Sequence, residues 1–272
     1  MTHSPDPVAI DTVPVSVETS APTGTTNAYL ADGVLVDPAA KTPELDRLTA
    51  ANTVHAIAVT HTHPDHVGGV RAYAQRTGAP VFAHAAHVDR FASATGVNPD
   101  GTFRDGESVA GRRIRALDTP GHASDHVAFA VDRFHDSTTD SLTDARSSVA
   151  LCGDLAVADG SVVVGGADAD LAAYLDSLRR LRDAGYDRLY PGHGPVIDEP
   201  VAACQRLIDH RLAREKSVLD AVENGAESVD AVVAAAYEKD LTGVEDLARA
   251  TVRAHLEKLV AEGRIADSWT RQ

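Results

Sequence analysis

The chain has 272 residues, of which 43% are hydrophobic, so it can bury the core of one large domain or of two unequal ones. Asp and Glu number 40 against 25 Lys and Arg, which gives a formal net charge of −15. No apolar run approaches the roughly 18 residues of a membrane span, and the N-terminal residues lack the basic and apolar regions of a signal peptide. We therefore expect a cytoplasmic protein without a membrane segment.

The first informative element is a short apolar run, Ala56–Val59, which predicts a buried strand. Three histidines and one carboxylate follow it directly: His61, His63, Asp65 and His66. Imidazole and carboxylate groups are ligands of borderline divalent metals such as zinc. After Gly68 and Gly69, residues 70–75 have a helical pattern. The cluster is thus predicted to lie on a loop at a strand end and to bind metal.

Three further candidate ligands occupy the same kind of position. His122 follows the predicted strand 114–117, Asp154 follows 148–151, and His193 follows 187–189. Each has a nearby glycine, which lets the backbone turn tightly. One such residue would be a weak signal, but four strand-end sites in one chain indicate a shared metal centre.

The ordered motifs His-x-His-x-Asp-His, Thr-Pro-Gly-His, Gly-Asp and Pro-Gly-His-Gly together resemble the metallo-β-lactamase superfamily over residues 10–200. The resemblance implies an αββα sandwich and two divalent ions, expected to be Zn²⁺. It implies a first metal held by His61, His63 and His122, and a second held by Asp65, His66 and His193, with Asp154 between them. Histidine at position 63, where the di-iron flavoprotein branch carries Glu, favours the hydrolytic branches.

Two cations about 3.5–4 Å apart can lower the pKa of a shared water to near 7, which opens ester, thioester and phosphodiester hydrolysis. Asp65 can ligate one metal and also orient this nucleophile, so we predict that it is catalytic. His126 lies four residues after His122. We also place His126 in the catalytic set as a substrate contact or proton donor, while a second-layer partner or a structural imidazole stays open.

Between two predicted strands, the polar stretch 132–144 predicts an exposed loop insertion. Beyond residue 200 the pattern changes to three helices, expected at 201–222, from Ser228 onward and at 244–262. Residues 264–269 then predict a short strand or wing. We therefore divide the chain into a catalytic domain, 1–200, and a helical, winged-helix-like domain, 201–272. A helical cap or an interface of a homodimer is the alternative.

This domain order resembles the β-lactamase-like hydrolases, a branch that includes an endoribonuclease for single-stranded RNA. Cleavage of RNA is therefore the first functional hypothesis. A thioesterase of the glyoxalase-II-like kind needs only the metal site and a small cleft, so it is the alternative. The third hypothesis is a winged-helix nucleic-acid-binding protein with a non-catalytic metal. The charge of −15 weighs against both nucleic-acid hypotheses, because phosphate binding draws on cationic surface.

High acidity together with only four lysines resembles the proteins of salt-loving archaea. Such a charge excess repels itself in dilute buffer and is screened in strong salt, where the Debye length falls to about 3 Å at 1 M. An acidic protein of ordinary salt tolerance is the alternative.

Overall fold

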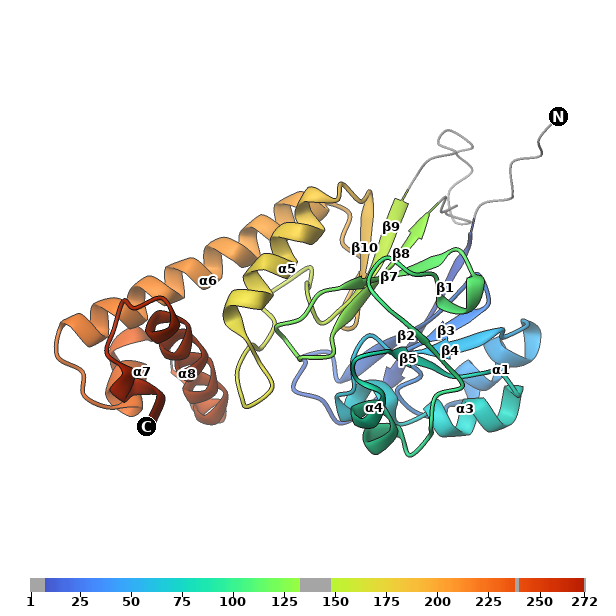
Figure 1. Ribbon diagram of the computed structural model, residues 1–272, viewed down its shortest axis with the longest axis horizontal. Helices are drawn as coiled ribbons and strands as arrows, with labels where there is room; N and C mark the ends of the chain where they lie inside the picture. The colour runs from blue at the N-terminus through green and yellow to red at the C-terminus, as the bar shows by residue number, and fades with distance from the viewer. Residues whose placement is uncertain (1–7, 133–147, 238–239, 272) are drawn as a thin grey trace.

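The computed structural model describes residues 8–132, 148–237 and 240–271 (Figure 1). The loop insertion expected at 132–144 lies, beyond its first residue, outside the described residues. Within the described ranges, no helix is long and apolar enough to cross a membrane.

Two four-stranded mixed sheets form the centre of the catalytic region. The first contains β1 (Ile10–Ser16), β2 (Thr25–Ala31), β3 (Val34–Val36) and β4 (Ala56–Ala58), in that order. The second has the order β10-β9-β8-β7, with β7 at Ile114–Asp118, β8 at Val127–Asp132, β9 at Ser148–Gly153 and β10 at Arg188–Pro191. In each sheet one edge pair is parallel, β3 with β4 and β9 with β10, and the other pairs are antiparallel. The ends of β4, β7, β9 and β10 are the strand ends to which the sequence assigned ligands.

Side chains that alternate along the strands build the layers. In β2, Tyr29 and Ala31 pack between the two sheets, whereas Ala28 and Leu30 pack toward helices on the outer face. This alternation follows from the two-residue period of a strand. The outer helices of the first sheet are α1 (Pro43–Ala51), α3 (Val70–Thr77) and α4 (Val88–Thr95), and α5 (Leu171–Asp183) covers the second sheet. The αββα expectation agrees with this arrangement.

Smaller elements complete the catalytic region. They are the one-turn helix α2 (Pro64–Val67), the parallel strand pair β5 (Phe82–His84) and β6 (Gly101–Phe103), and the short helix η1 (Val109–Gly111).

The C-terminal segment consists of α6 (Pro200–Glu223), α7 (Val229–Ala236), α8 (Glu245–Ala261) and the 3-10 helix η2 (Asp267–Arg271). Figure 1 shows α6 running beside α5 and carrying α7 and α8 at its far end. Near its start α6 buries Leu207 and Ile208 with α5, and near its end it buries Val218 with α7 and α8. One helix therefore joins the catalytic region to the C-terminal helices, and the division at residue 200 stays a prediction.

The strand or wing expected at 264–269 is absent: residues 267–271 form η2, and none of the described residues in 200–237 and 240–271 lies in a strand. A strand needs a neighbouring strand to satisfy its backbone groups, and the described part of the C-terminal segment offers none. The turn of η2 instead buries Trp269 against the C-terminal helices, in a cluster with Val252 and Leu259. The expected wing is therefore wrong, because a 3-10 helix stands where we expected a strand.

Candidate metal centre

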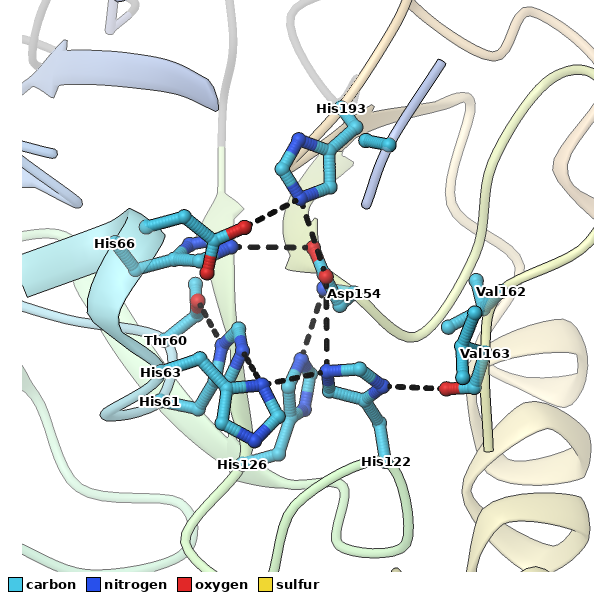
Figure 2. A network of polar contacts seen from close by, with 12 residues as sticks. Thr60, His61, His63, His66, His122, His126, Asp154, Val162, Val163 and His193 are labelled. Carbon is cyan, nitrogen blue, oxygen red and sulfur yellow. Dashed lines mark hydrogen bonds and ion pairs between the residues drawn. The ribbon is translucent and has the colours of Figure 1, made fainter. Parts of the chain in front are cut away.

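The structure brings all seven predicted ligands together at one end of the two sheets (Figure 2). They come from the loop after β4, from α2, from the loop between β7 and β8, and from the ends of β9 and β10. The residues are His61, His63, Asp65, His66, His122, Asp154 and His193. Their ligand atoms form three overlapping groups, and within each group the atoms lie within 4.8 Å of one another.

In the first group, imidazole nitrogens of three histidines converge. The Nδ1 atom of His63 lies 3.0 Å from Nε2 of His61 and 3.0 Å from Nε2 of His122. Figure 2 shows the three rings pointing at one another from two separate loops. The Nδ1 atom of His63 carries either one proton or one lone pair, so it can bond to only one of these two nitrogens at a time.

The second group lies beside the first and contains Asp65, His66 and His193. His193 Nε2 is 3.6 Å from Asp65 Oδ2. The Asp154 carboxylate faces both groups: its Oδ1 lies 3.4 Å from His66 Nε2, and its Oδ2 lies 3.3 Å from His193 Nε2 and 3.6 Å from His122 Nε2. The carboxylate of Asp154 therefore lies between the two groups.

These distances fit a pair of small divalent cations. A tetrahedral site with metal–ligand bonds of about 2.0–2.1 Å has ligand–ligand edges of about 3.3–3.4 Å, close to the separations observed here. His66 Nε2 and Asp154 Oδ1 are also buried without a hydrogen-bond partner, which costs free energy unless another group satisfies them. Gly192 leaves room beside them, since a Cβ atom there would lie 2.4 Å from Asp154 Oδ1. The donor set and its orphaned atoms therefore suit metal ions.

In four of the histidines, Nδ1 contacts another protein group while Nε2 faces the centre. Nδ1–H of His122 donates to the Val163 carbonyl at 2.9 Å, and Nδ1–H of His193 donates to the Thr25 carbonyl at 2.7 Å. His66 Nδ1 donates to Asp37 Oδ2 at 3.0 Å, while His61 Nδ1 lies 3.1 Å from Thr60 Oγ1. Such contacts select the tautomer that leaves Nε2 free to bind a metal.

Asp37 is a functional residue that the sequence reasoning missed. It is 1% exposed and accepts hydrogen bonds from the Thr60 N–H at 2.6 Å, from the Thr60 hydroxyl at 2.7 Å and from His66. It therefore orients His66 directly and His61 through Thr60. Its position directly after β3 is the same strand-end signal that identified the ligands, but no glycine stands beside it.

Asp168 and Arg90 were also missed. The Asp168 carboxylate lies 3.9 Å from His63 Nε2, on the side of that ring away from the other ligands. The Arg90 guanidinium binds both oxygens of Asp168 and donates to Thr62 Oγ1 at 2.7 Å. The pair thus braces His63 and the loop that carries it. Neither residue belongs to a motif, since Arg90 lies within α4 and Asp168 precedes α5.

His126 is 1% exposed, and both of its ring nitrogens are engaged. Nδ1 lies 3.0 Å from the Thr119 carbonyl, to which it can only donate, and Nε2 accepts from the Asp154 N–H at 3.1 Å. Burial, and then the nearby His122, lower its pKa to about 3, so the ring is neutral. These contacts make His126 a support for the Asp154 backbone and leave no nitrogen for a substrate.

Protonation states in the centre favour metal ligation. Burial lowers the pKa of His61 well below its ordinary value. Burial also opposes a charge on His66, but the carboxylates of Asp154 and Asp37 outweigh it and raise the His66 pKa well above the usual range. Burial alone would raise the pKa of Asp154, yet His66 and its neighbours hold it well below normal. Asp154 is therefore anionic, and a cation can replace the proton that His66 would otherwise hold.

A pocket of about 500 Å³ opens directly onto the centre. His63, Asp65, His122, Asp154 and His193 form its floor. One wall is the segment 18–23 between β1 and β2, and the other is the segment 157–165 after β9. None of the described residues that line the pocket is lysine, arginine or aromatic, and Glu18 and Asp159 add negative charge. The walls are otherwise mostly small or aliphatic.

The chain matches the family model described as the metallo-beta-lactamase superfamily over residues 21–193, more than half of its length. It is 29% identical over 230 residues to the beta-lactamase-like protein 2 homolog of Drosophila melanogaster, covering 78% of this chain and 70% of that protein. It is 32% identical over 213 residues to an atrochrysone carboxyl ACP thioesterase of Aspergillus chevalieri, covering 72% of this chain and 60% of the relative.

A solved structure of a metallo-beta-lactamase family protein from Thermus thermophilus has a TM-score of 0.71 to this chain, with 27% identity and coverage of 94% and 95% of the two chains. The similarity to that structure thus extends through the C-terminal helices. Motifs, fold, metal-ligand geometry and family match agree: the chain belongs to the metallo-beta-lactamase superfamily, as a hydrolase whose histidine and aspartate clusters suit a metal centre.

Proposed function

We propose that this protein is a metal-dependent hydrolase of acyl thioesters. The observation that carries the proposal is the composition of the pocket walls. Their side chains are mostly small and their surface is largely apolar, and no described residue that lines the pocket is lysine or arginine. Such a wall suits an uncharged acyl chain, whereas a polyanion such as RNA needs cationic partners for its phosphates. The net charge of −15 also disfavours the binding of a polyanion.

We further propose the ligand assignment that the motifs imply. His61, His63 and His122 hold one ion, Asp65, His66 and His193 hold the second, and Asp154 lies between the two. Two of the three observed ligand-atom groups match this division, and the third, His61, His66 and Asp154, spans it. Imidazole and carboxylate donors favour zinc. When bound, two zinc ions would supply a strong nucleophile from water at neutral pH and would polarise the thioester carbonyl.

The chain's own residues complete the proposed chemistry. Asp65 lines the pocket, so its carboxylate is in place to orient the attacking water and to take up its proton. His126 acts as a positioning residue, since its Nε2 holds the backbone N–H of Asp154. The pocket walls hold the acyl chain and keep bulk water away from the reacting carbonyl.

Two curated relatives carry the name of an ACP thioesterase, which supports the same bond class. Cleavage of single-stranded RNA, the first hypothesis from the sequence, keeps two observations as support: the order of its domains and the similarity to the beta-lactamase-like protein 2 homolog. The absence of the expected wing in the described tail weakens both this hypothesis and that of a nucleic-acid-binding protein with a non-catalytic metal.

The test compares three substrates with zinc-loaded protein in strong salt: a neutral acyl thioester such as acetyl-N-acetylcysteamine, single-stranded RNA, and bis(4-nitrophenyl) phosphate. We expect kcat/KM for the thioester to exceed that for either phosphodiester. An Asp65→Asn variant, which keeps the size of the side chain, controls for contaminating activity. Efficient RNA cleavage with an inert thioester would overturn the proposal.

A further inference from the structure

The segment 157–165, called the pocket loop here, supplies eight of the 22 residues that line the pocket. It also orients a metal-centre residue, because the Val163 carbonyl accepts the hydrogen bond from His122 Nδ1. Yet the loop contains no helix or strand, and within the described residues none of its backbone groups bonds to another backbone group. Its conformation must therefore be held by side chains.

Those side chains come from α6. The Arg206 guanidinium donates to the carbonyls of Val157 at 2.8 Å, Ala158 at 2.9 Å and Gly160 at 2.5 Å. One turn and a half further along the helix, the Arg211 guanidinium donates to the Val162 carbonyl, directly before Val163. A guanidinium carries five donors in a rigid fork, so a single side chain can bind several carbonyls at once.

Arg211 is 3% exposed and lies 5.8 Å from the ring centroid of Tyr174 in α5. The loop's end is seated against α8 as well: a Cβ atom on Gly165 would lie 2.5 Å from the carbonyl carbon of Ala250. The C-terminal helices thus contact the pocket loop at its start, its middle and its end.

We propose that Arg206 and Arg211 are positioning residues, through which the C-terminal helices set the shape of the acyl pocket and the orientation of His122. The inference rests on the proposed function for the identity of the substrate, but not for the clamping of the loop. The C-terminal segment then acts on the substrate through the pocket loop, without contacting it.

The test uses Arg206→Met, which removes the donors while keeping an unbranched apolar stem and, because this side chain is exposed, is expected to fold. Arg214→Met is the matched control. Arg214 lies on the same helix and also binds a carbonyl, that of Ala236, but its guanidinium covers the Tyr237 ring and does not reach the pocket loop.

Limited proteolysis with elastase, which cuts after small aliphatic residues, gives the first readout. In Arg206→Met we expect cleavage within 157–165 to be about tenfold faster than in wild type, since the loop opens locally when its carbonyls lose these charge-assisted bonds. Cleavage elsewhere in the chain, and cleavage of the control variant, should match wild type. Unchanged cleavage of the loop, or an equal acceleration in Arg214→Met, would overturn the clamp.

Kinetics give the second readout. For a medium-chain acyl-N-acetylcysteamine, Arg206→Met should raise KM about tenfold and change kcat by less than about twofold. Among the described residues, Arg206 binds only the carbonyls of Val157, Ala158 and Gly160, so its loss moves the pocket wall. Arg211 and Val163 still hold His122, so the chemistry stays. A loss of kcat at unchanged KM would contradict the positioning role. If wild type cleaves no thioester, the proposed function fails, while the proteolysis experiment still decides on the clamp.

Discussion

His255 in α8 offers a prediction whose size can be worked from the structure. Its side chain is fully buried, and neither ring nitrogen has a hydrogen-bond partner among the described residues. Burial, followed by the charges of Arg211, Arg214, Lys258 and His210, lowers its pKa to about 3. The imidazole is therefore neutral in the folded protein.

In the unfolded chain the His255 pKa returns to about 6.5. Between pH 6.5 and 3 the unfolded state thus binds a proton that the folded state does not, so stability falls as the pH decreases through this window. With a folded value of about 3, the loss between pH 7 and pH 5 from this one group is about 2 kcal/mol.

The variant His255→Leu removes the titration and replaces two unsatisfied nitrogens with an apolar side chain of similar volume. Its free energy of unfolding at pH 7 should equal or exceed that of wild type, because an orphaned polar group is lost. Between pH 7 and pH 5 it should lose about 2 kcal/mol less than wild type does. Guanidinium chloride unfolding at the two pH values, in constant salt, measures both quantities.

Protonation of the metal centre affects wild type and variant alike, so it cancels in this comparison. His55→Gln, which replaces an exposed imidazole directly before β4, is the control and should follow wild type. The reasoning is refuted if wild type and His255→Leu lose equal stability on going to pH 5.

Three further predictions concern the centre. Asp65→Ala should abolish turnover while circular dichroism shows an intact fold, because the sheet core is untouched; activity within a few-fold of wild type would remove Asp65 from the mechanism. Elemental analysis should find close to two metal ions per wild-type chain and one per chain of His193→Ala. Two metal ions per chain of the variant would argue against the assigned second site. Asp37→Asn, which keeps size but loses charge, should weaken zinc binding about 10–100-fold in a chelator competition, and unchanged affinity would deny Asp37 its orienting role.

Much of the site was predictable, because its ligands share a local signature. A strand followed by His or Asp near a glycine occurs at 56–69, 114–122, 148–154 and 188–194, and the structure gathers these segments. Asp37 also follows a strand, but Pro38 and two alanines come next and no glycine stands beside it. The wing at 264–269 was wrong because apolar residues near a chain turn do not tell whether a partner strand is near.

His126 shows where local sequence stops being informative. Its place four residues after His122 is equally compatible with a group that contacts substrate and with a structural one. Only the packing of the Asp154 backbone against Nε2, together with the Thr119 carbonyl on the other nitrogen, distinguishes the two.

By itself the sequence determined the metal chemistry, since ligand type and strand-end position are local properties that the order of residues records directly. The tertiary structure alone decided which groups hold those ligands and which residues line the pocket. Arg206 and the loop it binds are some 46 positions apart, and no periodicity or motif links a helical arginine to the carbonyls of a distant loop. Contacts of that kind arise when packed helices place a donor beside unpaired backbone groups, and they exist only once the chain has folded.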